Sequence, residues 1–169
     1  MKINKIKKAV FKANELTIVE DENGTQWVGT HAALYSMDGL PHMHDGQVCR
    51  LLDISAEKAA GLNAIKHYEE YGGLGQYNDV DKPAPAVKDM DDEIVINDVA
   101  LRAVTDENGR TVFFDPDLIA PVTKADIFKL STDDKLLAFE GLFLVAIISP
   151  LKPGAEMIGR VFELYSAMK

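Results

Sequence analysis

The stretch "IVEDENGTQW", Ile18 to Trp27, has a near-copy in "AVTDENGRTV", Ala103 to Val112. Both place Asp-Glu-Asn-Gly between β-branched runs. Asn-Gly in that setting predicts a β-hairpin, because both central residues of a type I′ turn need a positive φ. Residues 16–20 are therefore expected to pair antiparallel with 25–29, and 101–105 with 110–114. Each half of the chain should contain one such hairpin.

The two copies align with a shift of 85 residues, and six of the nine positions from 16 to 24 match. Two pseudo-repeated halves are one explanation. Independent use of a good hairpin turn is the other, and it is slightly favoured because the sequences diverge after the turn.

The rest of the first half predicts more β-structure and two helices. Residues 2–29 have β-branched and aromatic runs that favour strands throughout. Val48, Leu51 and Leu52 fall on one face of a helix over about 45–53. Ser55 is a credible N-cap for a second helix over 56–71, which Gly72 and Gly73 would end. Residues 72–93 are acidic and punctuated by Gly and Pro, so they are expected to form a linker or long loop.

The second half predicts a sheet and a helix. Strands are expected around Ile94–Val95, at 101–105 and 111–114, and on both sides of Glu140-Gly141; "DPDLIAPV" (115–122) should be a turn and a short strand. A C-terminal amphipathic helix over 155–168 is expected to pack on the second sheet. Its apolar positions are Met157, Val161, Leu164, Tyr165 and Met168. The sequence thus predicts an α+β fold with a lobe at 1–71, a linker at 72–93 and a lobe at 94–169.

Composition limits the class of protein. The chain has 169 residues, of which 47% are hydrophobic, and one cysteine, Cys49. A single cysteine excludes an internal disulfide and suits a reducing cytosol. The start "MKINKIKKAVFK" has no signal-peptide pattern, and the longest apolar run, 142–149, is too short for a membrane helix. A cytoplasmic protein without a membrane partner is expected.

Charge is unevenly distributed along the chain. The formal net charge is −9, yet five lysines precede the first acidic residue, Glu15: Lys2, Lys5, Lys7, Lys8 and Lys12. An acidic protein disfavours non-specific nucleic-acid binding. The basic segment is nevertheless a candidate contact for DNA phosphates or an acidic partner, although a lysine-protected edge strand is the simpler reading. Trp27 and Tyr35 are candidate aromatic anchors, but cross-strand packing is favoured for Trp27.

The "HMHD" stretch offers a metal site as an alternative. On a strand, His42 and His44 would point the same way, and Asp45 follows them. A third ligand would have to come from His31, His67 or a distant carboxylate. The flanking turn residues favour a ligand-free loop instead.

Other reactive side chains have structural readings. Cys49 fits the apolar stripe of a helix, and Asp115 and Asp117 fit a turn after a strand. The sequence contains no Walker A, C-x-x-C or G-x-S-x-G motif. No catalytic residue and no cofactor are predicted, and a non-enzymatic protein is favoured over an enzyme.

Three segments carry a resemblance. "GTQWVG" (24–29), "ALYSMDGLP" (33–41) and "VCRLLDI" (48–54) are similar to uncharacterised proteins from phages and prophages of Gram-positive bacteria. The similarity covers about the first 55 residues. It implies no catalytic residues.

The remainder of the chain resembles DNA sliding-clamp domains, chiefly at the strand "LVAIISPLK" (144–152). That resemblance implies repeated β-rich units with a few helices, an acidic chain, and basic residues on helices that face DNA. Two features depart from it. A full helix follows the strand that normally ends a clamp chain, and the lysines fall on a predicted strand.

The sequence therefore favours a non-enzymatic binding or interaction protein of phage or prophage type, with DNA metabolism among its candidate roles. A protein partner or self-association is expected, and DNA is a candidate ligand of the basic segment. Two alternatives stay open: a metal-dependent hydrolase that uses His42, His44 and Asp45, and a structural component that self-associates through the helix from Met157 to Met168.

Overall fold

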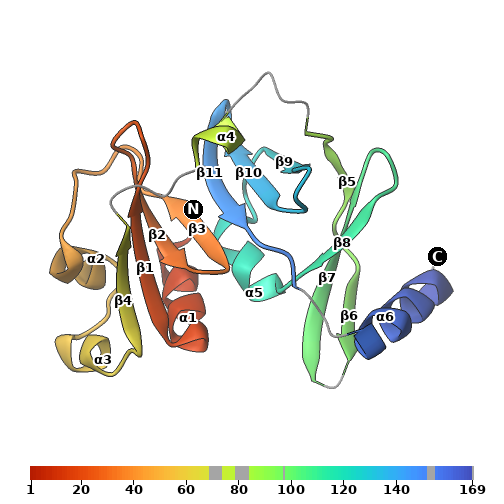
Figure 1. Ribbon diagram of the computed structural model, residues 1–169, viewed down its shortest axis with the longest axis horizontal. Coiled ribbons are helices and arrows are strands. Elements are labelled where there is room, and N and C mark those ends of the chain that lie inside the picture. The colour runs from red at the N-terminus through yellow and green to blue at the C-terminus, as the bar shows by residue number, and fades with distance from the viewer. Residues whose placement is uncertain (69–73, 79–83, 97, 152–154, 169) are drawn as a thin grey trace.

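The computed structural model describes residues 1–68, 74–78, 84–96, 98–151 and 155–168. The fold is α+β, as predicted, with a seven-stranded and a four-stranded sheet. Figure 1 shows the larger sheet at the left and centre and the smaller sheet with the C-terminal helix at the right. Gly72 and Gly73, and the central part of the predicted linker, lie outside the described residues.

The larger sheet has the strand order β4-β1-β2-β3-β11-β10-β9. These strands are β1 (Glu15–Glu20), β2 (Gln26–Thr30), β3 (Ala33–Ser36), β4 (Ala64–Tyr68), β9 (Ile127–Leu130), β10 (Leu136–Glu140) and β11 (Phe143–Ile148). Among the described residues of this sheet, only β1 and β4 pair in parallel. The sheet thus combines strands from both sides of the predicted linker.

In the sequence, the strands of the smaller sheet lie between β1–β4 and β9–β11 of the larger sheet. Long β7 (Val99–Asp106) pairs with β5 (Val87–Asp89), β6 (Glu93–Ile96) and β8 (Thr111–Phe114), always antiparallel. Helix α6 (Ala155–Met168) contacts this sheet. Val161 of α6 packs with Ile94, Leu101 and other buried residues of β6–β8.

Both faces of the central strands β1, β2 and β3 are buried, which explains the continuous apolar runs there. On one face Ile18, Val28 and Ile148 pack beneath helix α1 (Ile3–Ala13) and the short helices α2 (Asp45–Leu51), α3 (Ala56–Ala60) and α5 (Pro116–Ile119). On the other face Val19, Trp27 and Ile147 form a smaller cluster with Leu74. Leu74 directly precedes helix α4 (Gly75–Asn78). Neighbouring residues of a strand therefore serve opposite layers.

Three predicted elements are wrong, and the predicted linker or long loop at 72–93 contains helix α4 and strand β5, which pairs with β7. Residues 3–13 form α1 and not a strand, since Ile6, Ala9 and Val10 face the core at helical spacing and Asn14 ends the helix in the left-handed region. The predicted helix over 56–71 is only α3, followed by strand β4, because β1 offers a free edge to residues 64–68. The predicted strand within 115–122 is α5 and a 3₁₀ turn (Ala120–Val122), started by Pro116.

The two Asp-Glu-Asn-Gly hairpins form as predicted, but through a different turn. Only the glycines, Gly24 and Gly109, have a positive φ in these loops. Gly24 N–H donates to Asp21 O over 3.0 Å, and Asp21 N–H donates to Thr25 O over 3.0 Å. This is a type I turn followed by a left-handed glycine, not a type I′ turn. A third loop of the same kind spans 131–135, with Asp134 at the left-handed position and Ser131 in the role of aspartate.

The two Asp-Glu-Asn-Gly hairpins share one register at an offset of 85, since Thr17 pairs with Gly29 and Arg102 pairs with Phe114. Part of the register within the larger sheet also repeats, at an offset of 110. Glu20 pairs with Gln26 and Leu130 pairs with Leu136; Thr30 pairs with Ala33 and Glu140 pairs with Phe143. In each case, both residue numbers of the later pair are 110 higher than those of the earlier pair. This match between β1–β3 and β9–β11 ends at the register shift between Ala138 and Phe139, beyond which Ala138 pairs with Ala146. The two meanders join where β3 pairs with β11. The two Asp-Glu-Asn-Gly loops lie in different sheets.

Gly29, in β2, has no room for a side chain. A Cβ at this position would overlap the carbonyl oxygen of Ala33 on β3. Because that oxygen belongs to the backbone, it cannot rotate away as the end of a flexible side chain could. We expect Gly29→Ala to lower the free energy of unfolding by about 1–3 kcal/mol, as measured by urea denaturation. Gly159→Ala is the control, because nothing lies within 4 Å of a Cβ there and alanine favours a helix by about 0.5–1 kcal/mol. Equal stability of Gly29→Ala and wild type would contradict the close strand approach.

Candidate functional site

Helix α1 carries the basic residues of the N-terminal segment. Lys2 caps it, and Lys5, Lys8 and Lys12 are exposed at helical spacing on the side away from the core. Lys7 is half-buried at the side of the helix. The same 3.6-residue period that buries Ile6 and Val10 therefore gathers the lysines into one stripe.

The lysine stripe lies beside the acidic start of α5. Lys8 Nζ is 2.7 Å from Asp117 Oδ1, and Lys12 Nζ is 2.6 Å from Asp115 Oδ2 and 3.1 Å from Asp117 Oδ2. The hydrogen bond from Lys8 holds the pKa of Asp117 below its usual value. Asp115 also accepts from Asp117 N–H at 2.9 Å and so caps α5. These two carboxylates are structural in position, consistent with the turn reading of this segment.

Two other lysines are tied to neighbouring loops. Lys7 Nζ is 2.7 Å from Asp53 Oδ2, and Lys2 Nζ donates to Thr123 Oγ1 over 3.2 Å. Lys5 forms no ion pair with any of the described residues. Lys5 is therefore the lysine of this stripe most available to an external anion.

The ion pairs of Lys8 and Lys12 leave the ammonium groups on the outside, whereas Lys7 is more buried than its partner Asp53. The side chain of Lys8 is 60% exposed, whereas that of its partner Asp117 is 28% exposed. A bound anion would therefore meet the lysines before the carboxylates. Exposed pairs of this kind contribute only about 0–1 kcal/mol, so a phosphate can compete for the lysine.

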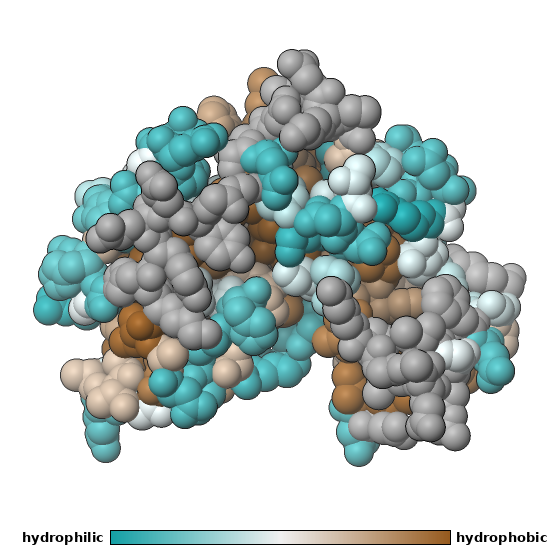
Figure 2. Space-filling view, viewed as in Figure 1, coloured by the Kyte–Doolittle hydropathy of each residue, from teal (hydrophilic) through white to brown (hydrophobic). Residues whose placement is uncertain are grey.

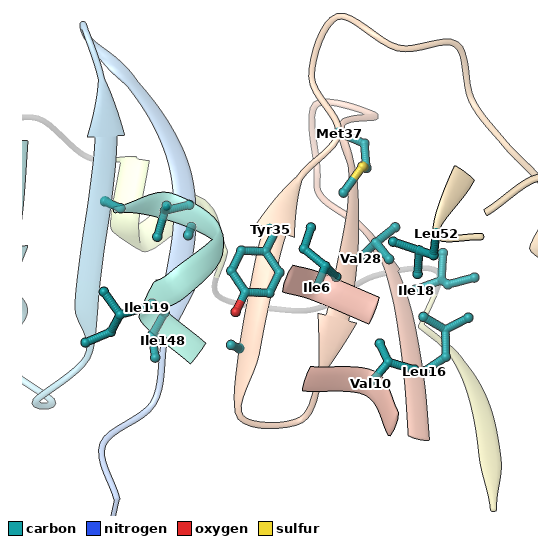
Figure 3. Packing of buried hydrophobic residues seen from close by; sticks show 14 of the residues in the cluster. Ile6, Val10, Leu16, Ile18, Val28, Tyr35, Met37, Leu52, Ile119 and Ile148 are labelled. Atoms are coloured by element: carbon teal, nitrogen blue, oxygen red, sulfur yellow. The ribbon is translucent and has the colours of Figure 1, made fainter. Parts of the chain in front are cut away.

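Trp27 and Tyr35 are core residues and not surface anchors, which corrects the prediction that they contact a partner. Their exposed fractions are 1% and 0%. Trp27 Nε1 donates to Asp21 Oδ2 over 3.1 Å, and Tyr35 Oη donates to the Leu118 carbonyl of α5 over 2.6 Å. Figure 3 shows the Tyr35 ring between Ile6 on one side and Ile119 on the other. Strand alternation turns both rings inward.

The "HMHD" stretch is a loop, as its turn residues indicate. His42 Nε2 is 3.0 Å from Glu20 Oε2, and the buried Gln26 amide holds Met43 through its backbone N–H and carbonyl. His44 precedes α2, where its N–H donates to Gln47 Oε1 over 3.1 Å. Within the described residues no group of three or more His, Cys, Asp or Glu side chains is placed to hold a metal ion.

Cys49 lies on the buried face of α2, where the sequence placed it. Burial raises the pKa of its thiol, and the nearby Asp45 adds to the effect. A thiol that resists ionisation is a poor nucleophile. The side chain is therefore a packing residue.

One exposed apolar surface was not predicted from the sequence. The run 142–149 predicts a buried strand, but its first two residues, Leu142 and Phe143, are 87% and 69% exposed at the β10–β11 turn. They border a groove of about 230 Å³ whose lining also includes Asp21, Asp38 and Leu144. Residue-type patterns do not distinguish a strand's buried end from its exposed end.

In the described part of the chain, no helix combines the length and the apolar character needed to cross a membrane. Comparisons with protein-family models, with curated proteins and with solved structures give no match for this chain.

Proposed function

We propose that this is a non-catalytic, cytoplasmic binding protein of phage or prophage type. It associates with DNA through the exposed stripe of α1 and serves as an accessory to DNA metabolism. The observation that carries the proposal is the placement of Lys5, Lys8 and Lys12 on one exposed side of a helix.

Two further features support DNA as the ligand. The lysines lie on a helix and not on a strand, which is the arrangement that the resemblance to sliding-clamp domains implies. Helices α1 and α5 contact each other on one face of the seven-stranded sheet, in keeping with the β-rich unit with a few helices that the same resemblance implies.

The overall negative charge of the protein opposes DNA binding. Binding therefore depends on local contacts. A chain with net charge −9 repels DNA at long range. Binding must therefore come from short-range lysine–phosphate contacts, each of which releases a counterion from the DNA. Such binding is weak at physiological salt and steeply dependent on ionic strength.

The test is fluorescence anisotropy of a short labelled DNA duplex between about 50 mM and 200 mM salt. We expect affinity to fall as salt rises. Replacing Lys5, Lys8 and Lys12 together by Gln should reduce the slope of log affinity against log salt by about 3, roughly one per phosphate contact. Lys5→Gln alone should reduce the slope by about 1. This substitution breaks no ion pair among the described residues.

The control variant is Lys88→Gln, which removes the same charge from an exposed position on β5. It should leave the slope unchanged. Absence of DNA binding at the lowest salt, or an equal loss in Lys88→Gln, would overturn the proposal.

The two alternatives have less support. A hydrolase using His42, His44 and Asp45 would need stoichiometric zinc or manganese in protein purified without added metal. Self-association through α6 competes with the sheet for the apolar face of that helix, since Val161 is already buried there.

A further inference from the structure

Strand β6 (Glu93–Ile96) forms one edge of the smaller sheet. In the part of the chain that the structure describes, its only ladder is with β7. Ala103 N–H donates to Asp92 O over 2.9 Å, which fixes the hydrogen-bonding phase of the ladder. Ile94 and Ile96 therefore bond to β7, whereas Glu93 and Val95 turn their N–H and C=O groups toward the free edge.

The side chains of β6 do not protect that edge. The strand reads Glu-Ile-Val-Ile and contains neither lysine nor proline, the residues that commonly block edge pairing. Ile94 and Ile96 are buried against α6, but Val95, on the opposite face, is 63% exposed. Figure 2 shows hydrophobic surface near the end of the β6–β7 hairpin. An apolar edge strand with free backbone groups is a template for another strand.

We infer that β6 pairs antiparallel with β6 of a second copy of this chain, about a two-fold axis at Ile94. In this register Ile94 faces Ile94 of the second copy, and Glu93 faces Val95 of the second copy. The outward groups of Glu93 and Val95 then exchange four backbone hydrogen bonds across the axis. The two small sheets become one continuous sheet, and the two-fold closes the assembly at a dimer.

The occupant is a second copy because the edge is complementary to itself. No like charges face each other, since each Glu93 meets a valine. A register centred on Val95 would leave only the two bonds of a Val95–Val95 pair among the described residues. The register at Ile94 therefore uses more of the free backbone groups.

The described side chains of helix α6 lie over the face of the smaller sheet. The helix contacts β6 through Val161 but leans inward, since Tyr165 lies edge-on to Phe113 of β8 with ring centroids 6.0 Å apart. Tyr165 Oη is also 3.1 Å from Thr105 Oγ1 on β7. This part of the helix thus crosses the sheet away from the free edge.

Charge sets the salt dependence of the dimer. Two copies of net charge −9 repel each other, and added salt screens that repulsion. Dimerisation should therefore strengthen with salt, whereas the proposed DNA binding should weaken. The two proposals can fail separately.

The test is sedimentation equilibrium of the full chain over a wide concentration range. Val95→Pro removes an N–H that points outward, so the bonds to β7 remain while two intermolecular bonds are lost. We expect its dissociation constant to rise about tenfold or more. Val95→Glu, which places a carboxylate opposite Glu93 of the second copy, should weaken the dimer as much and covers the case in which the proline variant does not fold.

Two further variants test the register and the position. Val95→Lys should keep the dimer, because the lysine would face Glu93 of the second copy. Val99→Thr changes an exposed valine on β7, away from the edge, and should also keep it. A monomer at all concentrations, a dimer indifferent to Val95→Pro and Val95→Glu, or a Val95→Lys variant as weak as Val95→Glu would overturn the inference.

Discussion

Replacing Trp27 by alanine is expected to lower the free energy of unfolding by about 3–5 kcal/mol. Trp27 is almost fully buried in the cluster of Val19, Leu144 and Ile147, where a truncated side chain leaves a cavity. Its indole N–H also satisfies Asp21 in the adjacent turn. Urea denaturation followed by circular dichroism measures the change.

The same experiment separates a core role from a binding role. Phe143 is a large aromatic residue in the same sheet but 69% exposed, so Phe143→Ala should change stability by less than about 1 kcal/mol. If Trp27→Ala were as stable as Phe143→Ala, Trp27 would not be a core residue and its candidacy as a partner anchor would return.

The hairpins were predictable because their determinants are local. Asp-Glu-Asn-Gly supplies a side-chain acceptor at its first position and a left-handed glycine at its fourth, and both are visible in sequence. The exact turn type was not, since Asn-Gly fits two turn types and only the strand register decides between them. The loop at 131–135 was missed because Ser131 and Asp134 fill the same positions without glycine.

The elements that failed depend on distant partners. Residues 3–13 mix Ile, Val and Phe with lysines. Such a run can form a strand or a helix, and the two differ only in which side chains are buried. Residues 64–68 become a strand because β1 pairs with them in parallel. The partial match in register between β1–β3 and β9–β11 left no sequence signal, since unrelated side chains satisfy the same register.

The candidate site was predictable in composition but not in arrangement. The lysines stood out because they precede every acidic residue of the chain. Their pairing with Asp115 and Asp117 joins segments more than 100 residues apart, which no local pattern records. Trp27 and Tyr35 were ambiguous for the same reason, because an aromatic residue on a strand serves a core or an interface according to what covers it.

Asp106→Ala is expected to lower the free energy of unfolding by about 1–3 kcal/mol. The carboxylate is 1% exposed. Its Oδ1 accepts from the backbone N–H groups of Asn108 and Arg110, each over 2.9 Å, and Oδ2 accepts from Arg110 Nε over 3.3 Å. Alanine would leave these donors without their acceptor in a turn that they define.

Asp106 also orients a link between the two sheets. Arg110 Nη2 donates to the carbonyls of Leu130 and Ser131, over 3.2 and 2.9 Å, at the end of β9 in the larger sheet. Loss of Asp106 therefore weakens one of the links between the two sheets, although Arg110 keeps its pair with Asp134 and Leu130 N–H donates to the Pro85 carbonyl. A double-mutant cycle with Arg110→Ala should show coupling of about 0.5–3 kcal/mol.

Glu107→Ala is the matched control, because Glu107 is exposed in the same turn and should cost no more than about 0.5 kcal/mol. Equal effects of the two substitutions, or additive effects of Asp106→Ala and Arg110→Ala, would mean that the turn is held by its glycine alone. The second Asp-Glu-Asn-Gly loop would then be only a hairpin end. Coupling would instead make it one of the links between the two sheets, a role that the first loop, where Trp27 donates to the aspartate, does not have.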